Sequence, residues 1–315
     1  FLVWTHGSLL GVDPPKDLLM KHLWILIACF SLLVNPGYSQ QQQKVADSLR
    51  PVYEADTISG IDKMILLDNL AYHEINDLDL ALKYAEELIL LAGAAGNNTY
   101  LYNGYQMKGH VGLRQNDLDM ALIAYQNAME VAQEENDKEG MALSSMYKGT
   151  VYADSDEPER AISHFEQSID LLRDPVLQKG ERGRYFLATL LINLSYLYID
   201  QDQLVKAGKY LQEARSMLKG FVPEMSRNLL PMILGNQGMI YARRGDHANA
   251  EENLIQSIKL FEEDGNYDPI AEYQITLAEV YWDEAEFEKA HDMAEQGLEQ
   301  GAEPLGVGAE RPRIA

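Results

Sequence analysis

The sequence lacks the short patterns by which many enzymes hold a phosphate, a metal or an activated nucleophile. It contains no GxxxxGK segment followed by Ser or Thr and no GxGxxG segment between a strand and a helix, which excludes the common phosphate-binding loops. HExxH and GxSxG are absent as well. The histidines beyond residue 70 fall in separate segments: His73, His110, His164, His247 and His291. We therefore expect no catalytic, cofactor-binding or metal-binding residues and no enzyme activity in this chain.

Cysteine and positive charge are also scarce. Cys29 is the one cysteine, so the chain cannot form an internal disulfide, and without a CxxC pair or a Cys/His cluster we exclude zinc and thiol redox chemistry. Asp and Glu number 49 against 26 Lys and Arg, which gives a net charge of −23. Such a field repels nucleic-acid backbones and anionic lipid headgroups. We expect no nucleic-acid partner and no direct membrane binding by the folded region.

Strand-length alternation of apolar and polar residues is missing between residues 61 and 300, which argues against a β-sheet. Apolar residues still make up 46% of the chain, as in ordinary folded proteins. Turn-forming residues divide this span into segments of helical length. The turns within helix pairs are expected at Asn76-Asp77, Asn116-Asp117, Asp156-Glu157-Pro158, Asp202 and Gly245-Asp246.

What the sequence has in abundance is one recurring spacing, and its reference point is called here the pivot alanine. The six pivot alanines, at intervals of 40, 40, 46, 43 and 40 residues, are Ala81, Ala121, Ala161, Ala207, Ala250 and Ala290. Position −12 from the pivot holds Asn69, Gly109, Gly149, Ser195, Gly238 and Ala278. Position −9 holds Tyr72, Gly112, Tyr152, Tyr198, Tyr241 and Tyr281, and position +7 holds Leu88, Ala128, Ser168, Ala214, Ser257 and Gly297. Small residues at the pivot and at −12 predict a close approach of two helices.

This pattern of small and aromatic residues resembles the tetratricopeptide repeat (TPR), with a period of about 40 residues in place of the usual 34 or so. The resemblance covers residues 61–300 and implies about six helix-turn-helix units. It predicts an all-α chain in which the helix pairs stack into a right-handed superhelix, with the first helices lining a concave groove. Tyr152, Tyr198, Tyr241 and Tyr281 are expected in matching positions between helices.

The groove-facing side chains are expected at positions −15 and −11. They are Leu66, Leu70, Gln106, His110, Met146, Thr150, Ile192, Tyr196, Gly235, Met239, Ile275 and Glu279. None of them is Lys, Arg or Asn, the residues that repeat domains use to clamp an acidic peptide terminus. The set is mainly apolar and includes adaptable methionines, which predicts a protein or peptide partner with an apolar or helical segment. The alternative is that the chain's own helices bury some of these side chains.

Residues 20–39 have the composition of a secretory signal peptide. Lys21 precedes an apolar run over residues 23–34, and small residues follow up to Ser39. The run is shorter than the roughly 20 residues that span a bilayer. We expect cleavage after Ser39 and an extracytoplasmic location, periplasmic or tethered to the membrane. A buried helix of a cytoplasmic protein and lipidation at Cys29 are the alternatives.

The other boundaries follow from composition. Residues 1–19 carry no repeat pattern and precede Met20, which indicates read-through from upstream of the true start. Residues 40–60 are expected to form a Gln-rich linker that grades into a capping helix including residues 45–49. Over residues 301–315 Gly, Pro and Arg replace the acidic repeat pattern. This change indicates either a disordered end or a truncated chain, and we favour truncation.

A more specific resemblance is carried by four segments: DLALKYAEELILLA (79–92), NTYLYNGYQMKGHVGLRQNDLDMAL (98–122), GNQGMIYARRGDHANAEENL (235–254) and NYDPIAEYQITLAEVY (266–281). They resemble the extracytoplasmic repeat region of bacterial membrane signalling proteins, in which a TPR array precedes a membrane helix and a class III adenylate/guanylate cyclase domain. The resemblance covers about residues 42–298. It implies an interaction or sensory module of a signal-transduction protein, here without the membrane helix and without a cyclase metal-binding aspartate.

The sequence leaves two alternatives to a truncated cyclase-like sensor. A self-contained secreted or periplasmic protein could use the same array as a binding scaffold, and similar arrays also precede sensor histidine kinases. DNA sequence beyond codon 315 would separate these alternatives, because about 20 apolar residues followed by an α/β domain would identify a membrane sensor.

Overall fold

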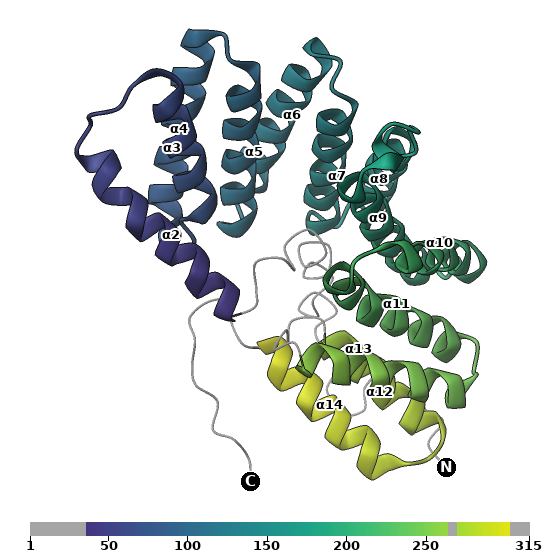
Figure 1. The fold of residues 1–315 in the computed structure, drawn as a ribbon. Helices are drawn as coiled ribbons and strands as arrows, with labels where there is room; N and C mark the ends of the chain where they lie inside the picture. The colour runs from purple at the N-terminus through teal and green to yellow at the C-terminus, as the bar shows by residue number, and fades with distance from the viewer. Residues whose placement is uncertain (1–35, 264–269, 303–315) are drawn as a thin grey trace.

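The helices of the protein follow one another around an arc (Figure 1). The computed structural model describes residues 36–263 and 270–302, and over these residues it contains no strand, which confirms the all-α prediction. The α-helices in these ranges are α2 (Pro36–Glu54), α3 (Gly60–His73), α4 (Leu78–Ala95), α5 (Asn98–Arg114), α6 (Leu118–Glu134), α7 (Lys138–Asp154), α8 (Pro158–Leu172), α9 (Glu181–Asp200), α10 (Leu204–Met217), α11 (Pro223–Arg243), α12 (His247–Glu263), α13 (Ile270–Asp283) and α14 (Phe287–Ala302). Short 3-10 helices, η1 (Leu177–Lys179) and η2 (Leu218–Gly220), lie in the connections after α8 and α10.

Helices α3 to α14 form six pairs, each of which is one repeat. In Figure 1 the first helices α5, α7, α9, α11 and α13 lie on the inner side of the arc, and the second helices lie on the outer side. The array begins at Gly60 and ends at Ala302, close to the predicted 61–300. Among the described helices none combines the length and the apolar character needed to cross a membrane. The right hand of the superhelix stays a prediction.

The pivot alanines lie at the contact between the two helices of each repeat. All six are at most 1% exposed, as the spacing predicts. Every residue at position +7 is buried as well. At two of these positions a serine hydroxyl donates to a carbonyl of the first helix, Ser168 to Ala142 and Ser257 to Pro231, each at 2.7 Å. The second helix is therefore held to the first by packing and by hydrogen bonds.

Glycine at position −12 makes room for the side chain at position +4. A Cβ atom on Gly109 would lie 2.4 Å from the ring of Tyr125, and one on Gly149 would lie 2.6 Å from the ring of Phe165. On Gly238 the Cβ would lie 2.7 Å from Cγ of Leu254 and 3.2 Å from its backbone nitrogen. These separations are shorter than carbon–carbon contact distances. The small residues found in the sequence are therefore required by the helix spacing.

Five of the turns within repeats share one conformation. The residue at position −5 has a positive φ in each of them: Asn116 (57°), Asp156 (57°), Asp202 (58°), Gly245 (72°) and Ala285 (61°). The next residue then donates its N–H to the carbonyl at position −9, as Asp246 does to Tyr241 at 3.0 Å and Gln203 to Tyr198 at 2.7 Å. This is the Schellman arrangement that ends many helices. Asn, Asp and Gly tolerate the left-handed conformation, which explains why the predicted turn residues fall where they do.

Three of the tyrosines at position −9 share an environment. Tyr152, Tyr198 and Tyr281 are at most 6% exposed, and the cation at position −1 lies over each ring. Tyr241 differs from the prediction because Asn249 takes the place of that cation, and its ring is half-buried. Tyr72 in the first repeat is 43% exposed. The turn of this repeat also differs, since α3 is followed by Glu74 in an extended conformation.

Helix α2 is longer than the expected capping helix of residues 45–49, and it covers most of the predicted linker. It is fixed to the first repeat by an ion pair between Arg50 and Glu74 at 2.5 Å. Its Tyr53 hydroxyl also donates to Glu87 at 2.8 Å. Gln has a good helix propensity, so the Gln-rich run is compatible with a helix.

The buried apolar side chains form two cores. A small core extends from Met64 to Ala92, within the first repeat. A large core extends from Leu113 to Ala290 through the other five repeats. Polar contacts, including Lys108 to Glu86 at 2.6 Å, link the two regions.

Substitution of Gly238 tests the helix spacing. Gly238→Leu places side-chain atoms where Leu254 already packs, so we expect the free energy of unfolding to fall by about 1–3 kcal/mol. Gly208→Ala is the control, because nothing lies within 4 Å of the added Cβ. In a helix this change is expected to stabilise by about 0.5–1 kcal/mol. An unfolding midpoint in urea that does not change for Gly238→Leu would contradict the proposed crossing.

Candidate functional site

Most of the side chains predicted to line the groove are buried by the chain's own helices. Seven of the ten candidate partner-binding residues are at most 9% exposed: Leu66, Leu70, Gln106, Met146, Thr150, Ile192 and Met239. His110, Tyr196 and Ile275 are half-buried. The first helices pack against second helices and also against one another, as α9 does against α11 and α11 against α13. Position −15 is buried in the first five repeats, so the expected apolar groove is largely the interior of the protein.

A charged residue stands at position −7 of every repeat, and the sequence prediction missed this set. The residues are Glu74, Arg114, Asp154, Asp200, Arg243 and Asp283. Position −7 is one helical turn beyond position −11, so the two share a face of the helix. Arg114, Asp200, Arg243 and Asp283 are exposed. Since the outer sides of these helices are covered by second helices, we assign this face to the inner side of the arc. The recurrence of charge at −7 was the sequence signal that could have found it.

Four carboxylates of α9 and α13 that influence one another electrostatically are named here the inner acidic cluster: Asp200, Glu272, Glu279 and Asp283. Burial first, and then the neighbouring charges of Glu279 and Asp200, raise the pKa of Glu272 to about 7. Burial likewise raises the pKa of Glu279. Arg243 is the cation that opposes both shifts. The cluster has more negative than positive charge and would be stabilised by an added cation.

The aromatic part of the inner face is in the second and third repeats. His110 shares a hydrogen bond of 2.7 Å between Nδ1 and the Tyr125 hydroxyl, and its ring lies edge-on to Tyr147. Burial, followed by the charge of Arg114, lowers the pKa of His110 to about 4. His110 is therefore neutral at pH 7 and packs as an aromatic side chain. His110 was predicted to bind a partner in the groove; in the structure its ring packs against Tyr125 and Tyr147.

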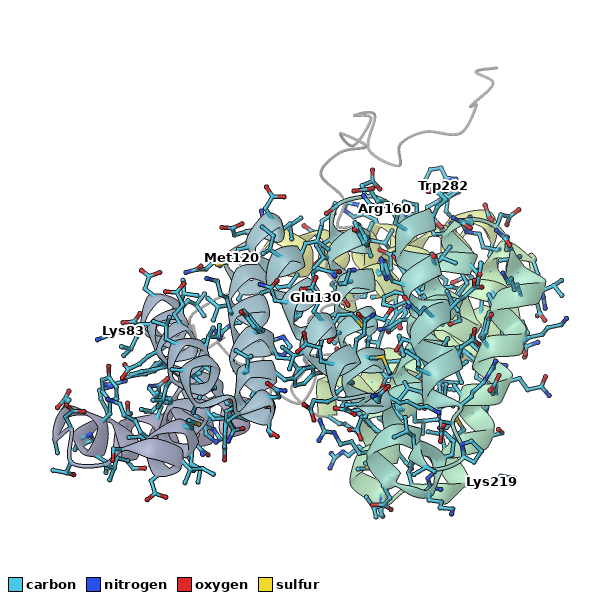
Figure 2. All side chains as sticks on the ribbon, turned by 90° about the horizontal axis from the view of Figure 1, so that it is seen from above. Lys83, Met120, Glu130, Arg160, Lys219 and Trp282 are labelled. Carbon is cyan, nitrogen blue, oxygen red and sulfur yellow. The ribbon has the colours of Figure 1, made fainter. Side chains whose placement is uncertain are left out.

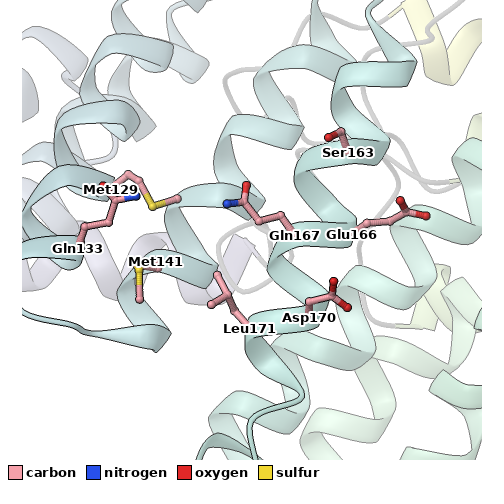
Figure 3. A pocket seen from close by; sticks show the side chains of 8 residues that line it. All are labelled: Met129, Gln133, Met141, Ser163, Glu166, Gln167, Asp170 and Leu171. Carbon is pink, nitrogen blue, oxygen red and sulfur yellow. The ribbon is translucent and has the colours of Figure 1, made fainter.

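An unpredicted shallow cavity lies on the outer side, between α6 and α8. Its volume is about 560 Å³. In Figure 3 Met129, Gln133 and Met141 line one side and Gln167 and Leu171 the other. Ser163, Glu166 and Asp170 complete the lining. Glu166 also accepts hydrogen bonds from Tyr198 and Lys206 of the following repeat, so it has a packing role. The described residues contain no group of three or more side chains able to hold a metal ion.

Comparison with known proteins identifies the repeat. A family model of the tetratricopeptide repeat matches residues 229–300, a segment that begins within α11 and ends within α14, and the same spacing recurs in the earlier pairs. The fold is a tetratricopeptide-repeat solenoid. No curated protein matches the chain.

Several solved TPR structures share this fold at low sequence identity. RapI in its apo form has a TM-score of 0.66 at 12% identity, over 86% of this chain and 96% of that one. A Rap protein complexed with Competence and Sporulation Factor has a TM-score of 0.58 at 17% identity, over 88% and 75% of the two chains. Aspartyl phosphate phosphatase F from Bacillus subtilis has a TM-score of 0.57 at 14% identity, over 98% and 100%. These likenesses support the TPR fold.

Asp154, the residue at −7 in the third TPR unit, gives a test of the inner face by pH. Its Oδ1 atom is buried with no hydrogen-bond partner among the described residues, and burial raises its pKa to about 8. The unfolded chain releases this proton near pH 4, so stability falls as pH rises from about 4 to 8. We expect Asp154→Asn to raise the free energy of unfolding by about 1–3 kcal/mol at pH 8 and to change it little at pH 4.

The matched control is Glu252→Gln, a change at an exposed carboxylate of α12. Its effect is expected to stay within about 0.5 kcal/mol at both pH values. Urea unfolding at pH 4, 6 and 8 measures the difference. An effect of Asp154→Asn that is the same at every pH would contradict the assigned burial of the carboxylate.

Proposed function

We propose that the chain is the sensory, partner-binding module of a signal-transduction protein. It binds a protein or peptide segment that carries Lys or Arg, along the inner face of α9, α11 and α13. The inner acidic cluster is the observation that carries this proposal, because burial, and after it the charges of Glu279 and Asp200, raises the pKa of Glu272 while Arg243 opposes the shift. A bound Lys or Arg side chain would relieve the repulsion among these carboxylates. The half-buried side chains of Tyr196 and Ile275 offer apolar contacts on the same helices.

The signalling role is supported by the resemblance of the four repeat segments to the sensor region of membrane nucleotide cyclases. No catalytic part belongs to the proposed module, and a TPR solenoid is usually a scaffold for binding. The original expectation of an apolar ligand is revised here to a basic segment with some apolar side chains. This revision follows from burial of most of the apolar candidate residues.

Peptide selection tests the partner chemistry. Random 12-residue peptides displayed on phage are selected on the full chain at pH 8, and the recovered peptides are expected to be enriched in Lys and Arg. Their affinity should fall at least tenfold for the double variant Glu272→Gln/Glu279→Gln. Because Glu272 ionises near pH 7, binding to the unmodified chain should strengthen between pH 6 and pH 8.

The control variant is Glu134→Gln/Glu252→Gln, which removes two exposed carboxylates of the second helices α6 and α12. It has the same net charge as the test variant, so it separates local from long-range attraction. Equal affinity of the selected peptides for both variants would overturn the inner cluster as the binding site. Peptides without enrichment in Lys or Arg would overturn the proposed partner chemistry.

We further propose an extracytoplasmic location, supported by Lys21, the apolar run over residues 23–34 and the small residues up to Ser39. Residues 20–35 lie outside the described residues, and residues 36–39 form the start of α2. Fusion of residues 20–60 to a reporter that is active only after export is expected to give activity. The changes Leu26→Asp and Leu32→Asp should abolish it, because each charge in the apolar run costs about 2.5–3.5 kcal/mol on insertion. Equal activity with and without the aspartates would exclude the apolar run as an export signal.

A further inference from the structure

The last repeat exposes apolar side chains at positions that are covered in earlier repeats. We call this surface the terminal face and define it by Trp282, Phe287 and Leu298, which are 43%, 55% and 43% exposed. Leu298 is at position +8, where Met129, Ile169 and Ile258 are at most 9% exposed. Trp282 is at position −8, where Leu113, Ala153 and Ile199 are at most 7% exposed. Trp282 projects from the edge of the molecule in Figure 2.

Position +8 of the earlier repeats is buried or half-buried wherever it holds an apolar residue, whereas Arg215 of the fourth repeat is exposed there. Gly104 of α5 approaches Ile89 at +8 of α4 so closely that a Cβ there would lie 2.8 Å from Cγ1 of the isoleucine. The same kind of packing joins α6 to α7 and α12 to α13. After α14 the described residues contain no further first helix. The terminal face thus continues an interface that is already built five times within the chain.

Position +5 indicates which polar group the missing helix carries. Glu86 accepts from Lys108 of the next repeat at 2.6 Å, and Gln126 accepts from Lys148 at 2.7 Å. Glu166 accepts from the Tyr198 hydroxyl at 2.7 Å. The last repeat has Glu295 at this position, exposed beside the terminal face. An apolar surface with one adjacent carboxylate fits an amphipathic helix that carries a donor near its apolar stripe.

We propose that the terminal face binds an amphipathic α-helix of a partner protein, in the place of the first helix of a further repeat. The partner helix packs its apolar stripe on Leu298 and Trp282 and directs a Lys or Tyr donor to Glu295. Phe287 is in edge-to-face contact with Trp282, with ring centroids 4.9 Å apart, and extends the apolar area. This site is on a different surface from the inner acidic cluster and does not depend on it.

A synthetic copy of α5 is the probe, because α5 makes the Lys108–Glu86 contact that the proposal transfers to Glu295. The peptide covers residues 97–114 and is held helical by a hydrocarbon staple, since short helices are marginal in water. Added to the full chain, it is expected to bind saturably in calorimetry. It should also protect Trp282 from fluorescence quenching by acrylamide, with Trp282→Phe as the control for signal from the other tryptophans.

Two variants locate the binding. Leu298→Asp is expected to weaken peptide binding at least tenfold, whereas Leu90→Asp, at a leucine of α4 that is 74% exposed, should leave it unchanged. A peptide with Lys108→Glu should bind the unmodified chain at least tenfold more weakly and should recover affinity for the Glu295→Lys chain. Circular dichroism shows whether each variant is folded. No binding up to 1 mM, or binding unaffected by Leu298→Asp and Glu295→Lys, would overturn the proposal.

Discussion

The close contact of two helices at each pivot alanine is the constraint on which the rest of the molecule depends. Glycine at position −12 leaves space that Tyr125, Phe165 or Leu254 fills from the opposite helix. Because this contact is made six times in one register, it also fixes which faces of the helices remain for solvent. The inner position of the charged residues at −7 is therefore a consequence of core packing. Packing does not specify their charge, which can act in binding or in local contacts.

The charged residues at position −7 have different contacts along the array. At position −7 Glu74 pairs with Arg50 of α2, and Arg114 donates to the Ile75 carbonyl, so these two charges serve the fold. Asp283 lies 3.8 Å from His247 of the preceding repeat, and Asp200, Asp283 and Arg243 influence the pKa values of Glu272 and Glu279 of α13. The likeness to the three solved structures, all at 17% identity or less, concerns the fold alone.

The repeat and its turns could be predicted from the sequence because each depends on residues a fixed distance apart. Ala250, Gly238 and Gly245 are read correctly since sterics within one helix pair decide their identity. The candidate site could not be predicted in the same way. Whether Met146 or Ile192 faces solvent depends on how closely neighbouring pairs pack, which no single repeat specifies. The half-buried Tyr241 shows the same limit, since one change from a cation to Asn249 alters its surroundings.

The division of the interior into two cores makes stability uneven along the chain. The first repeat has its own apolar core and is joined to the second by contacts that include the pairs Lys108–Glu86 and Asn103–Asp68. Tyr100, Leu101 and Met107 of α5 also pack against the first core, so the junction of these two repeats is partly apolar. The N-terminal repeat, with α2, packs against a neighbouring repeat on one side only, so it is a unit that can open while the other five stay folded. Such an event would lengthen the molecule at one end and leave the inner acidic cluster intact.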